Sequence, residues 1–125
     1  MKHPERVEDY LEHMAEAIER ATAYLQQVGS GEELEHNRLL QDAVARNIEI
    51  IGEAANHILQ MDPSFVVRHP ELPWPEMRGM RNKMVHGYFD VEWETVWGTV
   101  KTDLPLLKEQ IQALLLQLRQ ERERG

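Results

Sequence analysis

Apolar residues recur every three or four positions along most of this chain, a pattern typical of helices that bury one face. Pro4 suits a first helical turn and Gly29 suits a helix exit, so the pattern predicts a first helix from about Pro4 to about Val28. Its apolar stripe comprises Val7, Tyr10, Leu11, Met14, Ala17, Ile18, Ala21, Tyr24, Leu25 and Val28.

The second predicted helix is the most apolar. It has two candidate starts: Ser30 with Glu33 as a capping box, or Asn37 as an N-cap. Because its apolar residues cover a broad arc, we expect a partner on two sides, namely the first helix and a second copy of the chain. The arc comprises Leu39, Leu40, Ala43, Val44, Ile48, Ile50, Ile51, Ala54, Ala55, Ile58 and Leu59.

Four prolines then interrupt regular structure at positions 63, 70, 73 and 75. Phe65, Val66, Val67, Leu72 and Trp74 give this stretch apolar surface to bury, which predicts an ordered connection rather than a flexible linker. A short third helix is expected from Pro75, with Gly87 as the left-handed residue after its end.

Asp90 is a candidate N-cap for a fourth helix, which Pro105 interrupts or kinks. The apolar stripe continues beyond this proline, and the terminal sequence RQERERG predicts a solvated, fraying end. No segment shows the alternation of a strand. The pattern therefore predicts an all-α fold, a four- to five-helix up-and-down bundle forming one domain over residues 1–125.

Composition narrows the classes of function. The chain has no cysteine, which excludes disulfides and thiolate metal sites. It shows no signal peptide and no membrane-spanning stretch, so we expect a soluble, cytoplasmic protein. A net charge of −8 argues against a protein that coats nucleic acid with its whole surface. Any contact with nucleic acid must be local, and Arg78, Arg81 and Lys83 lie in a stretch without acidic residues, between Met77 and Tyr88.

The same stretch contains MRNKMVHGYF, an Arg-x4-His-x-Tyr arrangement formed by Arg81, His86 and Tyr88. In this helical context the chain resembles the HEPN toxins of the HepT type. The resemblance extends to RNIEIIGEAANHI in the second helix, LPWPEMRGMRN before the motif and VWGTVKTDLPLL in the last helix.

This resemblance implies a homodimeric HEPN bundle that cleaves RNA, such as transfer RNA or messenger RNA, without a metal or other cofactor. Arg81 and His86 would be the catalytic residues. It also implies an adjacent nucleotidyltransferase antitoxin that attaches AMP to Tyr88, so the chain would be a toxin and the target of the modification.

The residue types suit that chemistry on physical grounds. An imidazole titrates near neutrality and can take or give a proton, while a guanidinium can hold a phosphate in two hydrogen bonds. Five helical residues turn a side chain by roughly 140°, so Arg81 and His86 can converge only if His86 leaves the last turn. Arg78, Asn82 and Lys83 are further candidate RNA contacts.

Each motif residue also has a structural alternative. His86 could cap a helix, Arg81 could pair with Glu76 or Asp90, and Tyr88 could be a core-edge residue. The rival function is a non-catalytic helical scaffold that binds RNA or nucleotide within a nucleotidyltransferase complex.

Metal binding has weak support in the sequence. Glu33 with His36 is a lone Glu-x-x-His pair, and Glu53 with His57 is most simply an ordinary helix pair. The other histidines lack ligand spacing and are His3, His13 and His69. We therefore predict no metal site.

Overall fold

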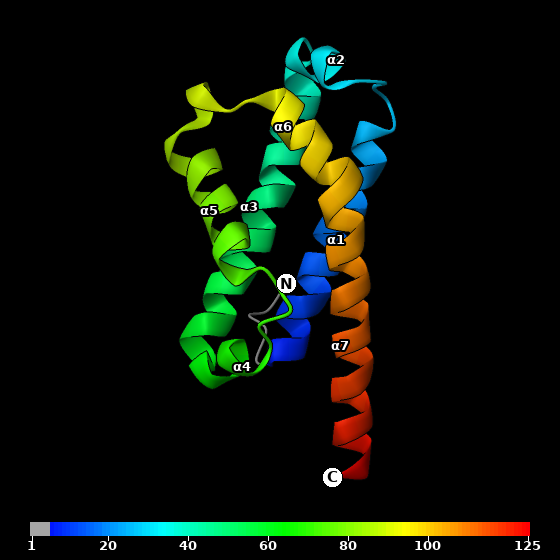
Figure 1. The fold of residues 1–125 in the computed structure, drawn as a ribbon, viewed down its shortest axis with the longest axis vertical. Coiled ribbons are helices and arrows are strands. Elements are labelled where there is room, and N and C mark those ends of the chain that lie inside the picture. Colours follow the sequence, from blue (N-terminus) through cyan, green and yellow to red (C-terminus); the bar gives the residue numbers. More distant parts are fainter. Residues whose placement is uncertain (1–5) are drawn as a thin grey trace.

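Four long helices run alternately up and down in the computed structural model, which describes residues 6–125 (Figure 1). They are α1 (Val7–Leu25), α3 (Arg38–Met61), α5 (Trp74–His86) and α7 (Leu104–Arg124). Three short helices connect them: α2 (Gly31–Glu35), α4 (Pro63–Arg68) and α6 (Trp93–Gly98). The described residues form no strand, which confirms the all-α prediction, although the short helices raise the number of elements above the expected four or five.

Both candidate starts of the second predicted helix are used, each for a helix of its own. The Ser30 hydroxyl accepts the Glu33 backbone N–H at 3.2 Å and caps α2. The Asn37 carbonyl oxygen accepts the Leu40 N–H at 3.0 Å and caps α3. The first helix ends at Leu25, three residues before the predicted position, and the expected start at Pro4 lies outside the described residues.

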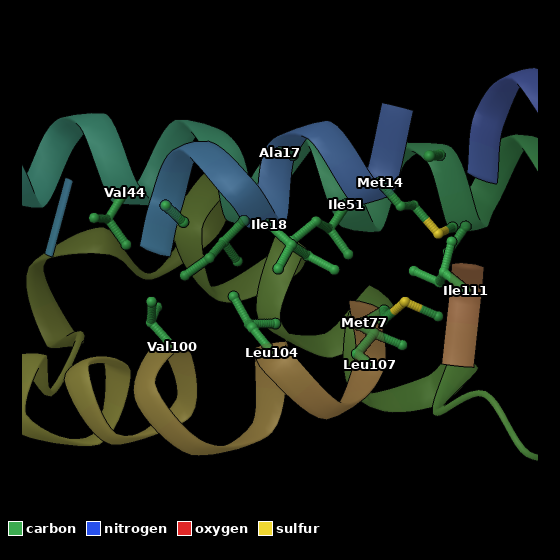
Figure 2. Packing of buried hydrophobic residues seen from close by; sticks show 14 of the residues in the cluster. Met14, Ala17, Ile18, Val44, Ile51, Met77, Val100, Leu104, Leu107 and Ile111 are labelled. Carbon is green, nitrogen blue, oxygen red and sulfur yellow. The ribbon is translucent and has the colours of Figure 1, made fainter. Parts of the chain in front are cut away.

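The core lies where the four long helices converge. Figure 2 shows Met14 and Ile18 of α1 and Ile51 of α3 facing Met77 of α5 and Leu107 of α7. Helix α1 covers one side of α3 and α5 covers another, so the broad apolar arc of α3 is covered mostly within one chain. Leu39 at the start of the arc stays exposed, and the expected homodimer remains a prediction.

A single polar side chain is buried within residues 6–125, and it is satisfied. Asn47 of α3 is 4% exposed. Its amide donates to the Ala43 carbonyl at 2.9 Å, and its oxygen accepts a bond from Arg20 Nε at 2.9 Å. The bond between Asn47 and Arg20 links α3 to α1, and it leaves neither the amide nor the oxygen of Asn47 without a hydrogen-bond partner.

The proline-rich connection is ordered, as predicted. Its first part is the helix α4, which Asp62 caps by accepting the Phe65 N–H. The Trp74 indole donates to the His69 carbonyl at 2.8 Å, and the Phe65 ring packs edge-on against Trp74. These contacts fix the point at which α5 begins.

The chain leaves α5 without the expected left-handed residue. Gly87 has φ −134° and ψ 36°, and its N–H donates to the Lys83 carbonyl at 2.9 Å. A short 3₁₀ turn, Tyr88–Asp90, follows directly. Asp90 lies in this turn and does not cap α6, which begins three residues beyond it at Trp93, after Glu92.

The predicted irregularity near Pro105 is present. A π-helical turn, Thr99–Asp103, joins α6 to α7, and Pro105 lies in the first turn of α7. The C-terminal residues are exposed, but they do not fray: α7 continues to Arg124. Ion pairs from Arg119 to Glu12 and from Arg122 to Glu8 hold this end against α1. No helix in residues 6–125 combines the length and apolar character needed to cross a membrane.

Helices α3 and α5 approach each other closely at Gly52, which is buried in α3. A Cβ atom placed there would lie 2.1 Å from the Cβ of Arg81 and 2.7 Å from the carbonyl oxygen of Met77. Both atoms belong to the helical framework of α5 and cannot rotate away. The absence of a side chain at Gly52 is therefore what allows α5 to reach its position.

Replacing Gly52 with alanine is expected to destabilise the protein. Overpacking typically costs about 1–3 kcal/mol, which exceeds the roughly 0.5–1 kcal/mol that alanine gains over glycine in a helix. The matched control is Gly79→Ala, because a Cβ at Gly79 in α5 meets no atom within 4 Å. Thermal melts followed by circular dichroism should show a lower Tm for Gly52→Ala and an equal or higher Tm for Gly79→Ala. Equal Tm values for Gly52→Ala and the parent would contradict the close approach.

Candidate functional site

Arg81 is anchored by its stem. Its Cβ packs on Gly52, its Nε is buried without a hydrogen-bond partner, and its Nη1 donates to the Asn82 side-chain oxygen at 3.1 Å. The alternative ion pairs to Glu76 and Asp90 do not form among the described residues. The guanidinium therefore keeps its positive charge without a carboxylate partner.

His86 is the last residue of α5, and its side chain is exposed. It has no hydrogen bond or ion pair within the part of the chain that the structure describes. The position leaves both ring nitrogens open to solvent or to a ligand.

The three further candidates for RNA contact lie on the same helix and are exposed. Arg78 donates from Nε to the Asn56 side-chain oxygen of α3 at 2.7 Å, and Asn82 accepts the bond from Arg81. Lys83 borders a shallow hollow between α5 and α6. The side of α5 that carries these groups is free of acidic residues between Met77 and Tyr88.

Tyr88 makes the long-range contact of the motif. Its hydroxyl donates a hydrogen bond to Oδ1 of Asp42 in α3, and its ring packs edge-on against Trp93, with centroids 5.6 Å apart. Burial of the half-buried ring raises the pKa of Tyr88 well above its usual range, and the bond to Asp42 and the charge of that carboxylate raise it further. The phenol is thus neutral at physiological pH.

Sequence reasoning missed Asp42. It lies 46 residues before Tyr88, in a helix whose other signals concern packing. A single sequence carries no information on which distant residues meet in space, so it could not identify the contact between Asp42 and Tyr88.

Within one chain no described hydrogen bond or hollow joins the three motif residues. Arg81 and His86 share no hydrogen bond among the described contacts, in keeping with their separation around the helix. Arg81 meets α3 at Gly52 and Tyr88 meets it at Asp42, ten residues or about 15 Å apart along the axis. The hollow beside Tyr88 is lined by Asp42, Ala45, Arg46, Glu49 and Met84, and neither Arg81 nor His86 borders it.

The weak metal candidates have other partners. The Glu33 carboxylate accepts the Gly29 N–H at 2.7 Å, Glu53 lies 3.9 Å from Arg46, and the His57 ring stacks on Tyr10 at 5.0 Å. Within residues 6–125 no group of three or more histidine, aspartate or glutamate side chains is arranged as a metal site.

A mostly apolar cavity lies away from the motif. A cavity of about 340 Å³ opens between α3, α5 and α7, with Ile51, Met77, Met80 and Leu107 among its walls. It contains none of the six candidate residues, so shape alone does not identify the motif as a ligand site.

Comparison with known proteins gives a consistent result. The model of the family described as "Ribonuclease HepT-like" matches residues 14–114. The "Probable ribonuclease HepT" of Thermococcus cleftensis is 42% identical over 106 residues, which cover 85% of this chain and 93% of that protein. The "Putative RNase TTE0752" of Caldanaerobacter subterraneus subsp. tengcongensis is 33% identical over 106 residues, covering 85% of this chain and 91% of that protein.

A third relative carries the same region within a longer chain. The "Gamma-glutamylcyclotransferase and putative RNase MJ0434" of Methanocaldococcus jannaschii is 37% identical over 112 residues, 90% of this chain but 49% of that protein. No solved structure matches this chain significantly. The extent of the family match and of the shared identity shows that the chain belongs to the HepT-like ribonuclease family.

Proposed function

We propose that this protein is a metal-independent endoribonuclease toxin in which Arg81 and His86 carry the chemistry. The observation that carries the proposal is the state of Arg81: its stem is fixed on Gly52 while its guanidinium has no carboxylate partner. A fixed cation without a carboxylate partner, in a stretch from Met77 to Tyr88 that has no acidic residue, suits a phosphate in a member of a ribonuclease family. Arg78, Asn82 and Lys83 would add contacts to the RNA backbone or bases.

The reaction is an attack by the ribose 2′-oxygen on the adjacent phosphorus. The 2′-hydroxyl proton leaves as the new O–P bond forms, and the bond to the 5′-oxygen breaks as that oxygen is protonated. His86 would serve as the acid or base, and Arg81 would stabilise the charge that develops on the phosphoryl oxygens. The products are a 2′,3′-cyclic phosphate and a 5′-hydroxyl, and no metal is required.

A homodimer completes the proposed site. Since Arg81 and His86 of one chain do not meet, a two-fold copy that pairs the motifs could bring the histidine of one protomer to the arginine of the other. Exposed apolar side chains surround the motif, as at an interface: Val85 and Phe89 flank His86, and Leu39 lies three residues from Asp42. Leu39 belongs to the apolar arc of α3 and stays exposed within one chain, so this part of the arc still supports the expected dimer.

The proposed regulator is a nucleotidyltransferase antitoxin encoded beside this chain, acting in the cytoplasm. AMP attached to Tyr88 places a negative phosphate and a bulky adenosine two residues from His86. Because Tyr88 and Arg81 meet α3 about 15 Å apart, one attached phosphate would act chiefly by blocking the surface beside His86 rather than by pairing directly with Arg81.

The rival function, a helical scaffold that binds RNA or nucleotide without cleaving it, requires the same basic surface. It differs in needing no proton transfer, so variants of His86 discriminate between the two.

We expect His86→Ala to lower the cleavage rate by about 10²–10⁴-fold, the usual contribution of a positioned acid or base, with no change in Tm since the side chain is exposed. Arg81→Lys, which keeps a stem on Gly52 but loses the fork, should cost about 10²–10³-fold. The assay uses transfer RNA in chelator, with detection of cyclic phosphate ends. His36→Ala, another exposed histidine, is the matched control and should cleave at the parental rate.

Three results would count against this prediction. Full cleavage by His86→Ala removes His86 as the acid or base, and loss of parental activity in chelator with recovery in magnesium or zinc overturns metal independence. Light scattering on the same samples should give twice 14.7 kDa, and an active monomer contradicts the dimer.

Co-expression with the adjacent nucleotidyltransferase should raise the mass of this chain by one or more AMP units and abolish cleavage. Tyr88→Phe should remain unmodified and active, because it lacks the acceptor oxygen but keeps the ring against Trp93. Intact-mass spectrometry and the RNA assay provide the readouts. A complex that inhibits the parent and Tyr88→Phe equally, without any mass increase, would mean that inhibition comes from binding alone.

A further inference from the structure

The phenol of Tyr88 is paired with a carboxylate. Its hydroxyl donates to Oδ1 of Asp42, which projects from α3, whereas Tyr88 belongs to the 3₁₀ turn after α5. Two separate elements thus bring a hydroxyl and a carboxylate into hydrogen-bond contact. A hydroxyl nucleophile beside a base is a recurrent arrangement for covalent group transfer.

No cation of the described residues lies within ion-pair distance of the Asp42 carboxylate. The nearby Arg46 is paired instead with Glu49 at 3.2 Å and with Glu53 at 3.9 Å. Asp42 forms no ion pair with any residue in the range 6–125. Among the described side-chain hydrogen bonds, the bond from Tyr88 is the one that its carboxylate accepts.

The pair borders an open hollow of about 320 Å³, lined also by Ala45, Met84 and the Arg46–Glu49 pair. The ring of Tyr88 is held by Trp93 from α6, at an interplanar angle of 79°. The hydroxyl is therefore fixed in direction while space remains beside it for an incoming group.

The surroundings of Tyr88 keep its phenol protonated, so a nearby base is needed to remove the proton. Burial and the charge of Asp42 raise the pKa of the phenol, so little phenolate exists at neutral pH, and the proton must leave as a bond forms on the oxygen. The charged groups that face the phenol come from α3, namely Arg38, Asp42, Arg46 and Glu49. Helices α5 and α6 contribute Met84 and Trp93, which do not titrate.

We propose that Asp42 is the catalytic base that activates Tyr88 as acceptor of a nucleotidyl group. This role rests on the proposed modification of Tyr88. In the step, Oη of Tyr88 bonds to the α-phosphorus of a nucleoside triphosphate as the bond from that phosphorus to the bridging oxygen breaks. Pyrophosphate leaves with the electron pair, and the phenolic proton passes to Asp42. The partner enzyme supplies the bound triphosphate, and this chain supplies the acceptor and the base.

The test measures incorporation of α-labelled ATP into the purified full-length chain by its adjacent nucleotidyltransferase. Asp42→Asn keeps the size of the side chain and an oxygen that can accept the hydrogen bond, but it cannot take the proton. We expect its rate to fall by about 10²–10⁴-fold. Asp42→Glu, which retains the carboxylate, should recover most of the rate, and Glu16→Gln, which changes an exposed carboxylate of α1 outside this hollow, should match the parent.

The pH profile separates a base from a merely structural partner. Without the Asp42 carboxylate, the reaction depends on the small fraction of Tyr88 that has lost its proton to water. The rate of Asp42→Asn should therefore rise by about tenfold per pH unit between pH 7 and 9, while the parental rate stays nearly level. A structural role would lower Tm and leave the shape of the profile unchanged.

Two outcomes would overturn the proposal, and they are distinguishable. Parental labelling of Asp42→Asn, with a parental profile, removes the role of Asp42 and leaves the modification of Tyr88 intact. No labelling of the parent chain by an enzyme that is active on ATP removes both.

Discussion

The close approach of α3 and α5 at Gly52 is the constraint on which the candidate site depends. Helix α5 packs chiefly on α3, and a Cβ at Gly52 would overlap the Cβ of Arg81. The same contact fixes the stem of Arg81, directs the end of α5 that carries His86, and brings the following turn to the place where Tyr88 reaches Asp42. A change of one methyl group in α3 therefore acts on all three motif residues together.

Helix α3 supports two separate chemistries in this account. Near Gly52 it holds the arginine proposed to bind the scissile phosphate, and about 15 Å away it presents Asp42 to the phenol proposed to receive AMP. This separation lets the modification proceed without disturbing Arg81. It also means that silencing depends on the size and charge of the attached group, and that cleavage depends on what a second protomer brings to the motif.

Much of this architecture could be predicted from the sequence because it is local. Apolar periodicity predicted α1, α3 and α7, and Pro75 predicted the short helix α5. Asn37 and Pro105 marked real features of α3 and α7. The motif residues were evident from their spacing. Contacts between distant segments were not: Gly52 reads as an ordinary small residue until α5 lies on it, and Asp42 meets Tyr88 across 46 residues. For Gly87 the local prediction was wrong. A glycine that ends a helix need not be left-handed when a 3₁₀ turn follows it directly.

The central claim is that this chain cleaves RNA through the substrate's own 2′-hydroxyl, with proton transfer and charge stabilisation supplied by Arg81 and His86. The most direct test uses a short RNA that the protein cleaves at one mapped bond, remade with a single 2′-deoxynucleotide on the 5′ side of that bond. The account predicts that cleavage there is abolished while the substituted RNA still competes with the parent RNA for binding. Cleavage at the deoxy position at an undiminished rate would contradict it, because a water molecule would then have to be the nucleophile.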